Sequence, residues 1–211
     1  MSDLTDALEE LMSQHRRIGS PVPDYLRPGQ PADRVLEQIV AVVRVDAPAD
    51  AIDLFSWHDG IDNESWERDD VGTGFARLFG DTHFAPLGDA VRHYRERIET
   101  DQITARYSMP GDAVQTWKPS WFPVFSEGWE TYGIECDPGN PDRGRLYDPS
   151  WDPPASVGPG PRFRDMLHLV ESAIRRFQAG GYVWDTATRF LEERGEVLEP
   201  LYEREIAEAR R

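Results

Sequence analysis

Hydrophobic residues recur at three- and four-residue spacing in several segments, which is the pattern of amphipathic helices. The first segment runs from about Ser2 to Arg17, and its stripe consists of Leu4, Ala7, Leu8, Leu11, Met12 and Ile18. Residues 19–31 hold four prolines and two glycines, which indicates a linker. A second helix is expected next, with the stripe Val35, Leu36, Ile39, Val40 and Val43.

The stretch LFSWHDGIDNESW, residues 54–66, is predicted to contain a helix end. Pro48 suits the first position of a short third helix, and Gly60 suits its end, so we expect this helix to stop at Asp59-Gly60. Residues 59–70 carry six acidic residues against one arginine, a net charge of −5, and are predicted to form an exposed acidic loop. A short strand at 75–79 and a helix at 87–98 follow.

The segment from Trp121 to Pro154 reads as three strands separated by turns. Tyr132, Ile134 and Cys136 alternate with polar positions, which predicts a half-buried middle strand. Residues 163–178 form the clearest amphipathic helix, and we expect it to cover this sheet. From Asp185 onward the composition is helical and acidic, with interruptions at Gly195 and Pro200.

These patterns predict an α+β fold, in which a sheet of short, mostly antiparallel strands is backed by helices. The length of 211 residues suits one domain with decorations. We therefore predict a single domain over residues 1–184 and an appended acidic helical tail over residues 185–211.

The charge is the strongest global signal, because 39 acidic residues against 23 basic ones give a net charge of −16. This field disfavours nucleic acid, whose binding depends on clustered Lys and Arg, and it favours a basic protein partner. The alternative is an acidic surface that only keeps the protein soluble. The single cysteine, the acidic N-terminus and the lack of a long apolar run predict a cytoplasmic protein with no membrane segment.

No strong catalytic or metal-binding motif appears, so no cofactor, metal site or catalytic residue is predicted. The acidic segment fails the calcium-loop pattern, and the five histidines lack the spacing of a zinc site. Cys136 is expected to face the core, and neighbours such as His58 and Asp59 do not face each other on a helix. Glycan hydrolysis stays open, because carboxylates lie near tryptophans: Glu127, Glu130, Glu135 and Asp137 beside Trp121, Trp129 and Trp151.

The order of the motifs resembles the SUKH superfamily, the Smi/Knr-type proteins, over residues 33–178. The matching pieces are WHDG at 57–60, RLFGDTHFAPLGDAV at 77–91, WFPV at 121–124, YGI at 132–134 and FRDMLHLVESAIRRF at 163–177. The resemblance implies an α+β protein-binding module without catalytic residues. Bacterial members of that superfamily commonly act as immunity proteins that neutralise polymorphic toxins, and fungal members are linked to cell-wall regulation.

The predicted function is therefore a non-enzymatic binder, such as an immunity protein for a basic toxin domain like a nuclease. A regulatory scaffold linked to cell-wall synthesis and a glycan-binding or glycan-hydrolysing protein are the alternatives. Trp66 is predicted to be the aromatic anchor of the partner-binding surface, with core packing as its alternative role. The acidic residues expected around it are Asp62, Glu64, Glu67, Asp69 and Asp70.

Overall fold

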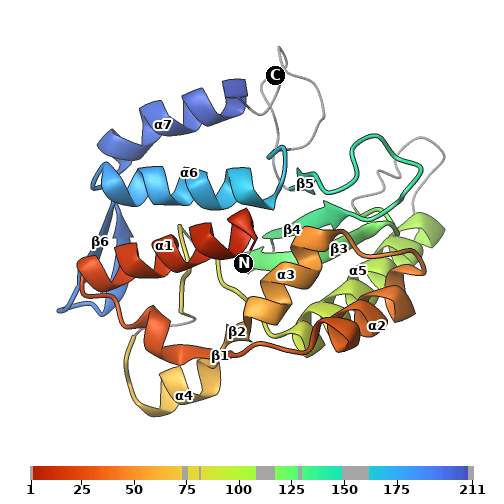
Figure 1. Cartoon of the computed structure of the whole chain (residues 1–211), viewed down its shortest axis with the longest axis horizontal. Helices are drawn as coiled ribbons and strands as arrows, with labels where there is room; N and C mark the ends of the chain where they lie inside the picture. Colours follow the sequence, from red (N-terminus) through yellow and green to blue (C-terminus); the bar gives the residue numbers. More distant parts are fainter. Residues whose placement is uncertain are drawn as a thin grey trace.

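The computed structural model describes residues 2–72, 76–80, 82–107, 117–127, 130–148 and 162–208 (Figure 1). Its elements follow one another along the chain as α1 (Asp3–Arg17), the 3₁₀ helix η1 (Val22–Tyr25), β1 (Leu26–Pro28), α2 (Ala32–Val43), α3 (Ala49–Trp57), β2 (His58–Ile61), α4 (Asn63–Arg68), α5 (Leu87–Tyr107), β3 (Trp121–Glu127), β4 (Glu130–Glu135), β5 (Leu146–Tyr147), α6 (Met166–Gln178), β6 (Tyr182–Asp185), β7 (Phe190–Glu193) and α7 (Gly195–Glu208).

The strands are short and pair in antiparallel fashion, which confirms the predicted α+β fold. Three strands form the sheet β3-β4-β5, while β1 pairs with β2 and β6 pairs with β7. Figure 1 shows α1, α6 and α7 lying roughly parallel in a row, with α2 and α5 gathered at the other end of the molecule. The α5 helix packs on β3, and α2 packs on both α3 and α5.

The helix α1 forms as its sequence predicts, because Ser2 caps it and its apolar stripe is buried. The Ser2 side chain accepts a hydrogen bond from the Thr5 N–H, and Leu8 and Leu11 have no exposed surface. The main partner of α1 is α6, which is capped in the same way by Asp165. The apolar stripe of α6 therefore packs on α1, and it belongs to the same buried core as β3 and β4, which the prediction expected it to cover.

The middle strand β4 is buried on both faces, whereas its alternating pattern predicted one exposed face. Thr131 and Glu135 are 3% and 0% exposed. A Cβ at Gly133 would lie 2.9 Å from the ring of Trp117, and Arg97 on α5 donates a hydrogen bond to the Thr131 hydroxyl. The ring of Trp117 and the helix α5 thus cover the face on which the sequence places polar residues.

The predicted helix end at Asp59-Gly60 lies two residues too late, because α3 ends at Trp57 and residues 58–61 form the strand β2. Asp59 is buried at 5% exposure. Its carboxylate accepts hydrogen bonds from Gln30 Nε2 at 2.6 Å and from the Leu87 N–H at 2.8 Å. The predicted exposed loop over residues 59–70 is therefore wrong, since β2 and α4 occupy most of it.

The segment after Tyr182 differs most from its prediction, because a β-hairpin precedes the C-terminal helix. The hairpin β6-β7 includes residue 185, at which the predicted tail begins. Leu191 and Leu198 belong to the same buried core as the rest of the described chain. The α7 helix packs on α6, where Glu205 forms a buried ion pair with Arg176. The residues beyond the hairpin are thus docked, and Pro200 lies inside α7 without ending it.

Two smaller predictions also change, both in the first half of the chain. Residues 19–31 contain η1 and β1, so they are more ordered than a linker. The helix predicted at 87–98 continues to Tyr107. Part of the strand predicted at 75–79 lies outside the described residues, and Phe79 makes only an isolated bridge to Thr82.

None of the helices in the described ranges is long and apolar enough to cross a lipid bilayer.

Replacing Gly60 by alanine is expected to lower the free energy of unfolding by roughly 2 to 4 kcal/mol. Gly60 has a φ of +76°, and a Cβ there would lie 2.6 Å from the Ala85 carbonyl carbon and 2.8 Å from the Pro86 Cα. Gly144→Ala is the matched control, because its φ is +85° but nothing lies within 4 Å of its Cβ position. It should cost only about 1 to 2 kcal/mol. If urea unfolding shows that the two variants lose equal amounts of unfolding free energy, β2 does not lie against residues 85–86.

Candidate functional site: a hollow beside helix α4

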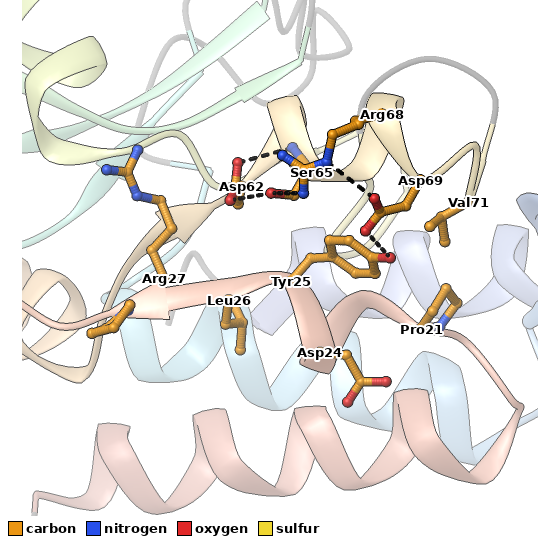
Figure 2. A pocket seen from close by; sticks show the side chains of 11 residues that line it. Pro21, Asp24, Tyr25, Leu26, Arg27, Asp62, Ser65, Arg68, Asp69 and Val71 are labelled. Carbon is orange, nitrogen blue, oxygen red and sulfur yellow. Dashed lines mark hydrogen bonds and ion pairs between the residues drawn. The ribbon is translucent and has the colours of Figure 1, made fainter.

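A surface hollow of about 700 Å³ lies between the η1-β1 segment and α4. Its volume falls in the range of roughly 300 to 1,000 Å³ found for sites that bind small molecules. Figure 2 shows the Tyr25 ring of one wall directed toward Asp69 of the other. The lining residues are Pro21, Asp24, Tyr25, Leu26, Arg27, Pro28, Asp62, Ser65, Arg68, Asp69 and Val71.

The α4 wall of the hollow is held by Asp62, which caps the helix. Its carboxylate accepts hydrogen bonds from the Ser65 N–H at 3.1 Å and from the Ser65 hydroxyl at 2.6 Å. These two bonds stabilise the charged form and lower the pKa of Asp62. In addition, the Asp62 N–H donates to the Tyr25 carbonyl at 2.8 Å, which ties α4 to the opposite wall. Asp62 is therefore a structural residue of this surface.

Asp69 lies at the other end of α4 and bridges the two walls. Its Oδ2 accepts a hydrogen bond from the Tyr25 hydroxyl at 3.2 Å, and its Oδ1 accepts one from Arg68 Nε at 3.2 Å. Partial desolvation is the largest cause that raises the pKa of Tyr25, and this hydrogen bond and the charge of Asp69 raise it further. The side chains of Arg68 and Asp69 keep 68% and 44% of their surface exposed. Their ion pair is therefore weak and replaceable.

Asp70 is paired within the chain as well, in this case with the C-terminal hairpin. Arg189 Nη1 lies 2.5 Å from Asp70 Oδ2 and also donates to the Asp70 carbonyl. Asp70 has a φ of +50°, which turns the chain at the end of the helix. The side chain of Asp70 is still 83% exposed, so this contact leaves the carboxylate open to water.

Glu64 and Glu67 differ from the other acidic residues of this surface. Both residues are exposed on α4, and neither side chain makes a hydrogen bond or an ion pair within the described part of the chain. The structure therefore brings the five predicted acidic residues together in one region but separates their roles. Asp62 caps the helix, Asp69 and Asp70 are paired, and Glu64 and Glu67 carry unpaired charge.

Trp66 is part of the core, so its prediction as an exposed anchor is wrong. It is 2% exposed. Its ring meets the ring of Tyr25 edge-on at 5.3 Å and the ring of Trp184 at 6.0 Å. A Cβ at Gly72 would lie 2.9 Å from the Trp66 ring, so the chain also closes over it. The short helix α4 buries this side chain because it must cover apolar surface from η1 and the hairpin.

The other chemical candidates are held in structural contacts. His58 Nδ1 lies 2.7 Å from the Arg27 carbonyl, while the Asp59 carboxylate is bound by Gln30 and the Leu87 N–H, so the hydrogen bonds of the two side chains go to different partners. Glu135 is fully buried and accepts hydrogen bonds from Trp121 Nε1 and Asn140 Nδ2. Trp129 and Trp151, and the side chains of Glu127 and Glu130, lie outside the described residues.

Cys136 is buried, as its strand position predicts. Burial raises the pKa of its thiol to about 12, so the reactive thiolate is scarce at neutral pH. Among the residues that the structure describes, no group of three or more His, Cys, Asp or Glu side chains is arranged to hold a metal ion.

Sequence reasoning missed the η1-β1 wall of the hollow. Pro21, Tyr25 and Pro28 were assigned to a linker, and nothing in the local pattern connects them with residues 62–71. Tyr25 was the available signal, because an aromatic residue with Val22 and Leu26 beside it among prolines is a candidate for packing. The chain matches no protein-family model, and no curated protein shows significant similarity to it.

Replacing Trp66 by alanine is expected to lower the free energy of unfolding by roughly 3 to 5 kcal/mol, because it empties a buried site between Tyr25 and Trp184. Trp66→Phe is the control and should cost less, roughly 1 to 2 kcal/mol. It keeps an aromatic ring of smaller volume, and the indole Nε1 that it removes makes no hydrogen bond in the described structure. An alanine variant as stable as the parent chain in urea unfolding would mean that the ring is exposed in solution.

Proposed function

We propose that this chain is a non-enzymatic binding module that neutralises a basic protein, such as a toxin domain with nuclease activity, in the cytoplasm. The observation that carries the proposal is the pair of exposed, unpaired glutamates, Glu64 and Glu67, beside a hollow with aromatic and aliphatic lining. Interfaces with basic proteins combine these features, since charge guides the approach and apolar side chains supply contact area.

The charge of the whole chain supports the same partner class. A net charge of −16 attracts a cationic surface and repels phosphates, so a nuclease that grips nucleic acid would be steered onto this protein. Neutralisation of such an enzyme needs only a surface that covers its site. The resemblance of the sequence motifs to the SUKH superfamily agrees with this role.

The proposal expects a basic toxin domain to be encoded beside the gene of this chain, and the direct test uses that domain. The two purified proteins are expected to form a complex with a Kd below about 1 µM at physiological salt. Nuclease activity should fall in proportion to the fraction of toxin bound. The proposal fails if size-exclusion chromatography finds no complex at about 50 µM of each protein, or if the complex forms and the nuclease remains fully active.

The double charge reversal Glu64→Lys/Glu67→Lys is expected to slow association with that toxin by about tenfold at low salt and to flatten the salt dependence of the rate. Both side chains are exposed and unpaired, so the fold should tolerate the change. Stopped-flow mixing at two salt concentrations measures the effect.

The matched control is Glu171→Lys/Glu199→Lys, which changes the net charge by the same amount on α6 and α7. Both residues are exposed, and Figure 1 places these helices at the opposite end of the molecule from α4. The control should slow association by less than about twofold. If both variants slow it equally, net charge alone guides the partner and α4 is not the docking surface.

A further inference from the structure

We infer that the hollow between η1-β1 and α4 receives an arginine side chain of the basic partner, which displaces Arg68 from Asp69. This inference rests on the proposed function, because it names the group by which that partner is recognised. It goes beyond charge attraction, since it assigns a specific side chain to a specific cavity.

The apolar lining suits the stem of a long basic side chain. Tyr25, Leu26 and Val71 lie along the hollow, together with Pro21 and Pro28. Arginine and lysine bury their methylene stems on such surfaces while the charged end reaches a polar group. A carboxylate or phosphate ligand has no long methylene stem to place on this apolar lining, and its negative charge would lie beside acidic residues.

The polar end of the hollow suits a guanidinium in particular. Figure 2 shows the Tyr25 ring, Asp69 and Arg68 grouped at one end, with the Arg27 side chain directed away from them. Arg68 donates to Asp69 through Nε alone, at 3.2 Å, while its Nη2 donates to the Ser65 hydroxyl at 2.9 Å. An incoming guanidinium can instead offer Asp69 two parallel N–H donors and stack on the aromatic ring.

The charge balance of the region favours this exchange. The lining contains three aspartates, Asp24, Asp62 and Asp69, against Arg27 and Arg68. Glu64 and Glu67, which lie on α4 outside the lining, add two further unpaired negative charges to this helix. The exposed Asp24 side chain makes no hydrogen bond or ion pair within the described residues, so its carboxylate adds a further negative charge to the η1 wall.

The test titrates the isolated, isotope-labelled chain with N-acetyl-arginine amide and follows backbone amide signals by NMR. Saturable shifts are expected at Tyr25, Leu26, Ser65 and Val71, with a Kd of about 1 to 10 mM, as suits a ligand of this size. N-acetyl-citrulline amide is the matched probe, because it has nearly the same shape and no charge. The inference is overturned if the citrulline probe gives the same shifts, or if the arginine probe shifts only residues elsewhere.

Asp69→Asn should weaken binding of the arginine probe by about tenfold, because it removes the charged acceptor and keeps the side-chain shape. Glu199→Gln on α7 removes one charge far from the hollow and should leave the Kd unchanged. An unchanged Kd in Asp69→Asn overturns the inference. The probe experiment needs no toxin, so the two claims can fail separately. If Asp69→Asn leaves toxin binding unchanged, only this inference is rejected. If the probe binds and the toxin does not, the proposed function is rejected.

Discussion

The arrangement of the candidate site depends on the buried carboxylate of Asp59. This carboxylate joins the chain before α2 to the first residue of α5, through Gln30 and Leu87. The adjacent Gly60 lets β2 lie directly against the backbone of Ala85 and Pro86, and the Ile61 N–H donates to the Phe84 carbonyl at 2.8 Å. Because β2 leads straight into α4, this fixed strand determines where the acidic helix faces the solvent.

Much of the fold could be predicted from local patterns, and the reason is physical. The helices α1, α2 and α6 carry stripes whose period is that of the helix itself, and β3 and β4 lie between strong turn residues. The element that packs on each helix or strand was harder to predict, because an apolar stripe indicates that a face is buried but does not indicate which element buries it. The second face of β4 is one example, since the ring of Trp117 and α5 that cover it come from other parts of the chain.

The candidate site was predictable in composition and not in detail. The acidic residues from Asp62 to Asp70 were identified by charge, but a carboxylate that caps a helix and one that is unpaired look alike in a sequence. Trp66 was misassigned because α4 has only six residues, too few to show a helical period. The residues that bury it, Tyr25 and Trp184, lie far from it along the chain, and the second strand of the hairpin that carries Trp184 falls in the segment predicted to be a helical tail.

The candidate surface is acidic, and Asp62 and Trp66 hold α4 in place on it while Glu64 and Glu67 are exposed. Its central claim is that a basic protein docks on this surface. Hydrogen–deuterium exchange of the chain alone and in complex with the proposed toxin partner tests this claim most directly. The account predicts added protection at residues 24–28 and 62–71, with α7 unchanged. Protection confined to α2, α6 or α7, with exchange in residues 62–71 unaltered, would contradict it.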